Sequence, residues 1–143
     1  MSNFDTISAI TDNIETVLKN LGINFTREVY DNVDSIPASI LPHGRIFYVS
    51  ESFEYPHGQK PAYADAVFRA TIILMNRDAL EMIRDQQKWA HDIREAITVN
   101  ALNVGSLSTT KYVSLASIAG IDIDNTADKS ALDITIQIRY REV

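Results

Sequence analysis

The sequence predicts an α+β domain, in which a mostly antiparallel sheet of four to five strands carries two main helices packed on it. Three observations lead to this prediction. The last stretch, Ala131 to Val143, alternates apolar and polar residues with the period of a half-buried strand. Two other stretches have apolar residues at helical spacing, and the segments follow in the order helix, strands, helix, strands. The 143 residues are predicted to form a single domain, 1–143.

The final stretch indicates where the core lies. Slipping this strand by one residue would move its whole apolar face into water, so its facing is strongly specified. We therefore expect the chain to end inside its own fold. The residues on the apolar face are Leu132, Ile134, Ile136, Ile138 and Tyr140.

The first helix is predicted from Asn3 to Asn20. Asp5 or Thr6 is a suitable N-cap, and Gly22 can close the helix in the left-handed conformation. The face opposite the apolar stripe is polar, so we expect a helix that lies on the sheet with its outer side in water. The stripe consists of Ile7, Ile10, Ile14, Val17, Leu18 and Leu21.

Three strands are expected between the two helices. Residues Ile23 to Val33 alternate well enough for a short strand, and Ile46 to Val49 are dense in β-branched and aromatic residues. Tyr63 to Met75 becomes apolar on both faces towards its end, which predicts a central strand covered on two sides there. The stretch from Glu54 to Tyr63 holds two prolines and a glycine and is predicted to be a long hairpin tip.

The second helix is predicted to start at Asp78, because Glu81 three residues later completes a capping box. We expect it to fray around Asn100 to Gly105. Trp89 lies beside the apolar stripe, and we expect it to pack on the core instead of anchoring a partner. The predicted stripe is Leu80, Ile83, Gln87, Ala90, Ile93 and Ile97.

Strand character resumes at Lys111, and Gly120 predicts a bulge or bend in this strand. The next turn, from Asp124 to Ser130, contributes to a cluster of three aspartates, Asp122, Asp124 and Asp128. An EF-hand loop needs a glycine and a glutamate where this chain has Ala127 and Asp133. We interpret the cluster as turn chemistry, with side chains bonded to their own backbone.

Composition limits the classes of function. A formal net charge of −6 argues against nucleic-acid binding through a basic surface, although an acidic wall past which DNA slides is compatible with it. The chain has no cysteine, which excludes disulfides and thiolate nucleophiles and fits a reducing compartment. The first residues lack the pattern of a secretory signal, and no apolar run is long enough to cross a bilayer. We expect a soluble product without a membrane partner.

No constellation of catalytic or metal-binding residues is recognisable in the sequence. His43, His57 and His91 are scattered and lack the spacing of metal ligands. Neither a nucleophile elbow nor a phosphate-binding glycine motif occurs. We therefore predict no catalytic residue, no metal, no cofactor and no enzymatic activity.

Five features follow one another along nearly the whole chain. They are the amphipathic first helix, the passage from Asp31 to Pro42 into RIFYV, the loop EYPHGQKP, the passage AVFRATIILMNRDAL and the ending ALDITIQIRYREV. This layout resembles the tail terminator, or tail-completion, proteins of long-tailed bacteriophages. Members of that family are similar small α+β proteins, and no catalytic residue belongs to their role.

The resemblance implies a structural virion protein. It would form a hexameric ring of its own copies on the last ring of the tail tube, stop tube polymerisation and provide the head–tail joining surface. Its partners would be the tail tube protein and neck or connector proteins, and DNA would only pass through the ring lumen. Its place would be the head-proximal end of the tail, after assembly in the host cytoplasm. Two alternatives stay open: another ring-forming neck or connector component, and an α+β small-ligand-binding protein or enzyme.

A cyclic ring needs two different contact patches on each subunit. One candidate patch is the predicted hairpin tip, where Tyr55, His57 and Lys60 can reach a neighbour. The other is the polar side of the final strand, where Arg139 and Arg141 add positive charge to an acidic protein. These five residues are the predicted subunit or tube interface.

Overall fold

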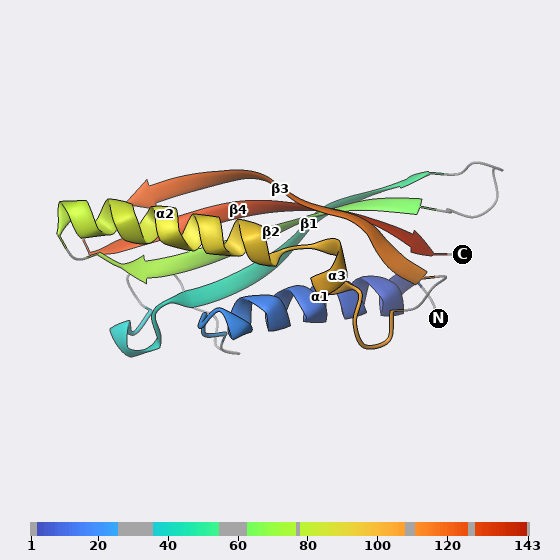
Figure 1. Ribbon diagram of the computed structural model, residues 1–143, viewed down its shortest axis with the longest axis horizontal. Helices are drawn as coiled ribbons and strands as arrows, with labels where there is room; N and C mark the ends of the chain where they lie inside the picture. The colour runs from blue at the N-terminus through green and yellow to red at the C-terminus, as the bar shows by residue number, and fades with distance from the viewer. Residues whose placement is uncertain are drawn as a thin grey trace.

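The computed structural model describes residues 3–25, 36–54, 63–76, 78–107, 111–125 and 128–142. Its four strands form one antiparallel sheet in the order β1-β2-β4-β3, and its helices lie along that sheet (Figure 1). This architecture confirms the predicted α+β class. The elements are α1 (Asn3–Asn20), the 3-10 helix η2 (Ala38–Ile40), β1 (His43–Glu54), β2 (Tyr63–Met75), α2 (Ala79–Ala96), α3 (Val99–Leu102), β3 (Lys111–Asn125) and β4 (Lys129–Glu142).

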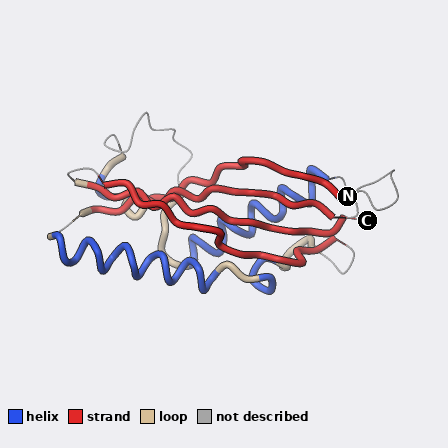
Figure 2. Tube along the Cα trace, turned by 90° about the horizontal axis from the view of Figure 1, so that it is seen from above, coloured by secondary structure: helices blue, strands red, loops and turns tan. Residues whose placement is uncertain are grey.

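The last strand lies inside the sheet. β4 is hydrogen-bonded to β2 on one side and to β3 on the other, and all four strands run along the length of the molecule (Figure 2). Its predicted apolar face is 0–1% exposed, and Ile136 stands opposite Phe68 of β2. The predicted facing of this strand is confirmed.

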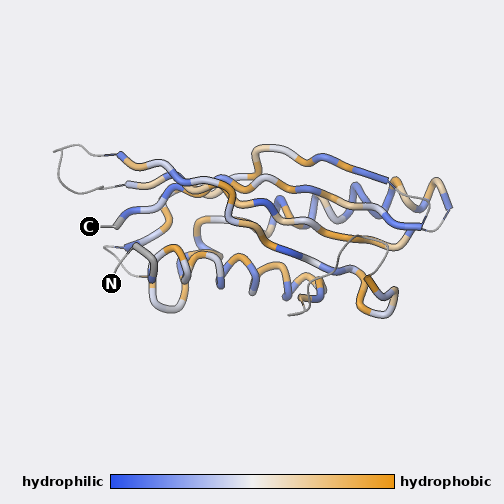
Figure 3. The backbone as a smooth tube through the Cα atoms, turned by 180° about the vertical axis from the view of Figure 1, so that it is seen from behind, coloured by the Kyte–Doolittle hydropathy of each residue, from blue (hydrophilic) through white to orange (hydrophobic). Residues whose placement is uncertain are grey.

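Both main helices pack on the same face of the sheet. Ile10 and Ile14 of α1 and Ile93 of α2 belong to one buried cluster with the apolar face of β4. Trp89 packs against this cluster, as predicted. Apolar and polar residues alternate along the strands (Figure 3). Because successive side chains point to opposite faces, the sheet has a helix-covered apolar face and a second, more polar face.

One end of the sheet is covered on both sides. Ile72 and Ile73 are neighbours in β2 and point to opposite faces, yet both are fully buried. Lys129 is buried as well, and its Nζ donates a hydrogen bond to the carbonyl oxygen of Ile36 at 3.0 Å. Ile36 itself is buried, and its hydrogen bond with Lys129 holds this segment beside the start of β4.

The N-terminal predictions need one correction, which concerns the N-cap of the first helix. The first helix begins at Asn3, so neither Asp5 nor Thr6 is its N-cap. Asp5 lies in the first turn, where the positive end of the helix dipole stabilises a carboxylate. Gly22 has the predicted left-handed conformation, with φ at 100°. The strand predicted from Ile23 to Val33 is described only at its start, where Asn24 forms an isolated parallel bridge to His43; residues 26–35 lie outside the described part.

The predicted stripe of the second helix is confirmed only in its second half, where Ile93 and Ile97 are buried and Ala90 packs against the core. Leu80 is 57% exposed, and Ile83 and Gln87 are exposed as well. In the first half of the helix the buried position is instead Gln86. Gln86 is therefore buried at the point where the predicted stripe placed its neighbour Gln87.

A polar network explains this facing. The Nε2 atom of Gln86 donates hydrogen bonds to Asn125 Oδ1 and Ser130 Oγ, both at 2.8 Å. The Ser130 hydroxyl is also within hydrogen-bond distance of the side-chain oxygens of Asn76 and Asn125. Because a buried amide is costly unless it is hydrogen-bonded, this network fixes the rotation of α2 against the β3–β4 hairpin.

The ends of α2 follow its capping chemistry. Asp78 Oδ1 accepts a hydrogen bond from the backbone N–H of Glu81 at 2.9 Å, as the predicted cap requires. The predicted fraying is wrong, because α2 stops at Ala96 and a separate short helix, α3, begins three residues later at Val99. Thr98 caps α3 by accepting a hydrogen bond from the N–H of Ala101 at 3.1 Å.

The β3–β4 hairpin is longer than predicted. Asp122 and Asp124 both lie within β3, so they are not part of a turn, and the interpretation of the aspartate cluster as turn chemistry is wrong for these two. The reason is that the β3–β4 ladder continues in register as far as the pair Asn125 and Ser130. The predicted irregularity at Gly120 is confirmed by a register shift between Ile118 and Gly120.

Replacing Gly44 with Ala is expected to destabilise the protein. A Cβ at this position in β1 would lie 2.7 Å from Ile23 Cγ2 and 2.7 Å from Phe25 Cζ, and such overpacking costs about 1–3 kcal/mol. Gly120→Ala is the matched control, because nothing lies within 4 Å of its added Cβ. Thermal unfolding of both variants checks this. Equal melting temperatures would contradict the close approach at Gly44.

Candidate functional site

The face of the sheet opposite the two main helices is the candidate functional site. We call it the open face, and it is the face presented by Asp65, Val67 and Arg69 of β2 and by their partners in the other strands. Residues that stand opposite each other in antiparallel strands point to the same side. The register therefore places Arg139 and Gln137 of β4 on the open face as well.

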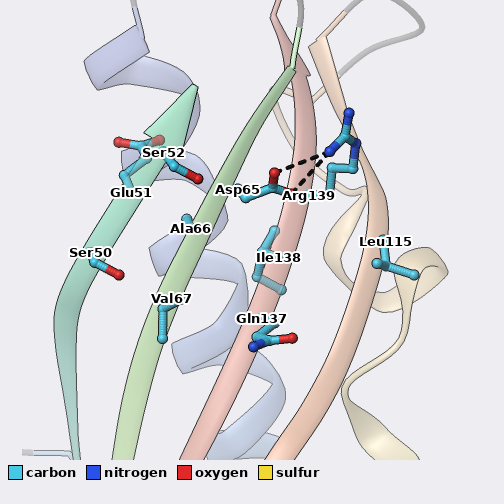
Figure 4. Close-up of a pocket in the computed structure, with 10 residues that line it drawn as sticks. All are labelled: Ser50, Glu51, Ser52, Asp65, Ala66, Val67, Leu115, Gln137, Ile138 and Arg139. Atoms are coloured by element: carbon cyan, nitrogen blue, oxygen red, sulfur yellow. Dashed lines mark hydrogen bonds and ion pairs between the residues drawn. The ribbon is translucent and has the colours of Figure 1, made fainter. Parts of the chain in front are cut away.

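A shallow hollow runs across the open face. All four strands contribute to it, and the side chains of Asp65 and Arg139 point towards each other beside it (Figure 4). Leu115 on its border is 54% exposed. A shallow surface that mixes apolar and charged groups is typical of contacts with another protein, because small-molecule sites are mostly deep and enclosed. The lining residues are Ser50, Glu51, Ser52, Asp65, Ala66, Val67, Leu115, Gln137, Ile138 and Arg139.

Arg139 connects three strands across the open face. Its guanidinium forms ion pairs with Glu54 of β1 and with Asp65 of β2, the latter at 3.1 Å. The guanidinium carbon also lies 4.7 Å from the centre of the Tyr63 ring. The hydrogen bond with Glu54 raises the pKa of Arg139 above its ordinary value, and the charge of Asp65 acts in the same direction. Arg139 therefore stabilises the open face from within the subunit.

The structure describes two of the five predicted interface residues, Arg139 and Arg141. Arg139 and Arg141 share the open face, as the sequence predicted, but the charge of Arg139 is already matched by two carboxylates. A hydrogen bond with Tyr112 raises the pKa of Arg141. Tyr55, His57 and Lys60 lie outside the described residues. The interface prediction for all five stays a prediction.

Reversing the charge of Arg139 is expected to weaken the fold. Arg139→Glu places a third carboxylate beside Glu54 and Asp65, so the attraction across the open face becomes repulsion. We expect a lower melting temperature that recovers in part at high salt, which screens exposed charges. Gln137→Glu, on the same face and strand, is the control and should change little. A melting temperature of Arg139→Glu that equals the control would contradict the proposed role.

A second polar contact fixes β1 on the other face of the sheet. The hydroxyl groups of Tyr48 and Tyr140 both donate hydrogen bonds to the carboxylate of Glu51. Burial, followed by this hydrogen bond, raises the pKa of Tyr48 to about 12. Tyr140 is fully buried, so its hydroxyl needs such a partner. Sequence reasoning placed Tyr140 in the core but gave no signal for a partner 89 residues away.

The two edges of the sheet carry exposed apolar side chains. Apart from the bridge between Asn24 and His43, no strand in the described part of the chain pairs with the outer side of β1 or β3. Phe47 in β1 is 45% exposed, and Leu115 and Ile123 in β3 are exposed too. Proteins usually blunt or cover long edges, because unpaired strands recruit other chains. These two edges are therefore candidate contact surfaces.

His43 makes stability depend on pH. Burial lowers its pKa below the ordinary 6.5, and the charge of Arg45 acts in the same direction. Below about pH 6.5, His43 binds a proton more readily in the unfolded chain than in the folded protein. The free energy of unfolding should therefore fall as the pH drops through that range. We expect the melting temperature of the wild type to decrease more than that of His43→Gln between about pH 7.5 and pH 5.5. Parallel curves for the two proteins would contradict this.

Among the described residues, no group of three or more His, Cys, Asp or Glu side chains is arranged to hold a metal ion. No helix in the described ranges is long and apolar enough to span a bilayer.

No protein-family model matches the chain, and no curated protein is significantly similar to it in sequence.

Proposed function

We propose that this protein is a structural virion protein of the tail terminator type. It caps the last ring of the tail tube, stops tube polymerisation and forms the surface to which the head joins. Its partners are further copies of itself in a hexameric ring, the tail tube protein and neck or connector proteins. DNA passes through the ring lumen without being bound.

One observation carries this proposal: in the described part of the chain the sheet has two edges that pair with no further strand beyond the bridge between Asn24 and His43, and they lie on opposite sides of one subunit. β1 and β3 are the outermost strands, and both expose large apolar residues. A closed ring is built from contacts between two different patches of each subunit. Edges at opposite ends of the strand order meet this requirement.

The charge of the protein also supports the proposal. With a net charge of −6, the chain is not suited to holding DNA through its phosphates. A ring through which DNA moves benefits from a wall that does not bind it. The ion pairs with Glu54 and Asp65 neutralise the charge of Arg139, so this residue attracts phosphates on DNA less strongly.

Electron microscopy of the protein mixed with tail tubes tests the proposal. We expect rings at one end of each tube, because a weak lateral contact gains from the high local concentration that a symmetric template imposes. Rings bound to isolated connectors but absent from tubes would instead assign the protein to the neck. Bare tube ends and bare connectors would contradict both virion roles.

A further inference from the structure

The direction of the edge strands determines how two copies can meet. Each strand is antiparallel to its neighbour in the order β1-β2-β4-β3, so β1 and β3 run in opposite directions. A second copy placed beside the first in the same orientation brings its β1 antiparallel to β3 of the first. The sheet can therefore continue from one subunit to the next without a change of pairing type.

Charges at the two edges match when the copies are placed in register. The row of residues across the sheet that begins at Arg45 runs through Thr71 and Asp133 and ends at Asp122. Asp122 and Asp133 thus stand opposite each other on the open face, and like charges in such a pair are destabilising. Thr71 donates a hydrogen bond to Asp133 at 2.7 Å, but no cation of the described residues forms an ion pair with Asp122.

Arg45 is the cation at the other end of this row. In the described part of the chain it makes a cation–π contact with Phe47, 5.8 Å from the ring centre, and no ion pair. In a row that continues into a second copy, Arg45 of that copy stands next to Asp122 of the first. Arg45 of the second copy would then neutralise Asp122, and the repulsion between Asp122 and Asp133 would decrease. Within one subunit Arg45 and Asp122 lie at opposite edges of the sheet and cannot meet.

The neighbouring row on the open face is complementary in shape. It begins at Phe47, passes through Arg69 and Thr135, and ends at Gly120. Phe47 is largely exposed, and the space above Gly120 is empty to 4 Å. An aromatic ring on an adjacent strand is a known way to cover a glycine in a sheet.

The backbone limits the contact to a short segment. Asn24 already accepts a hydrogen bond from the N–H of Gly44, so the free part of the β1 edge begins at Arg45. The register of β1 shifts only after Tyr48, and the register of β3 shifts just before Gly120. Residues 45–47 and 120–122 therefore lie in regular parts of their ladders and in the same rows of the sheet. We propose that Arg45–Phe47 of one copy pairs with Gly120–Asp122 of the next copy as antiparallel strands. This inference rests on the proposed function, which supplies the ring in which the copies meet.

Cysteine trapping tests the pairing directly, because the chain has no cysteine of its own. The double variant Phe47→Cys with Gly120→Cys is kept at high protein concentration in a glutathione redox buffer. We expect a ladder of disulfide-linked oligomers, whereas either single variant stays monomeric under the same conditions. Absence of the ladder, or a dimer from one cysteine alone, would overturn the head-to-tail pairing.

Charge exchange tests the proposed ion pair without changing the backbone. Arg45→Asp and Asp122→Arg each place like charges at the contact and should weaken association about tenfold or more. The double variant Arg45→Asp with Asp122→Arg restores opposite charges and should restore association. Thermal unfolding establishes that all three variants are folded. Folded single variants that associate like the wild type, or a double variant that stays as weak as the singles, would overturn the pair.

The same variants separate this inference from the proposed function. Disulfide ladders from a protein that leaves tail tubes uncapped would support the edge pairing and contradict the terminator role. Capped tubes from a protein that gives no ladder would support the terminator role and overturn the edge pairing.

Discussion

Replacing Ile136 with Asp is expected to leave the protein unfolded or insoluble. Ile136 is fully buried in the central strand β4, opposite Phe68 of β2 and Ile118 of β3. A carboxylate at this position has no partner in the apolar core, and it also removes an aliphatic side chain. Together these effects cost about 4 kcal/mol or more, a large fraction of the 5–15 kcal/mol that stabilises a typical domain.

The neighbouring residue provides the control for this prediction. Thr135 points to the open face, where it stands opposite Arg69 of β2 and Gly120 of β3. Thr135→Asp places a carboxylate across from an arginine, so a change within about 0.5 kcal/mol is expected. Solubility and thermal unfolding of both variants decide the matter. Similar melting temperatures for the two would show that the facing of β4 is wrong.

Removing the side chain of Gln86 is expected to lower the free energy of unfolding by about 2–3 kcal/mol, the largest loss expected after that of Ile136→Asp. Gln86→Ala leaves a cavity beneath α2 and removes the donor that Asn125 and Ser130 share. Denaturant unfolding measures the loss. Gln87→Ala is the control, because Gln87 is exposed and should change stability by less than about 0.5 kcal/mol. A larger loss from Gln87→Ala would reverse the rotation of α2 described above.

The strands were predictable where local pattern determines their facing. In β4, alternation separates core from open face without reference to the rest of the chain, and the structure agrees at each apolar position. The two apolar faces at the end of β2 likewise predicted an interior position. These predictions succeed because one face of a strand must be buried as a unit, so the sequence itself records the facing.

The facing of the first half of α2 was not predictable from its own sequence. Leu80 and Ile83 fit an apolar stripe, but the helix turns Gln86 inward because its hydrogen-bond acceptors lie 39 and 44 residues further along the chain. Helical periodicity cannot detect a partner so distant. A polar network of this kind therefore overrides the local hydrophobic pattern.

The candidate site was predictable only in part. The sequence placed Arg139 and Arg141 on one polar face, but the ion pairs of Arg139 join residues 74 and 85 positions apart. The row that links Arg45 to Asp122 depends on strand order and register, which no local pattern specifies. Edge surfaces in general become visible only when the order of strands is known.

Tube polymerisation in the presence of the protein is the experiment that decides the terminator role. Tube protein is allowed to assemble, the protein is added in excess while the tubes are still growing, and tube lengths are measured by electron microscopy over time. The terminator role predicts that lengths stop increasing at the time of addition and that one end of each tube carries a ring. Tubes that continue to lengthen at the rate seen without the protein would contradict the role.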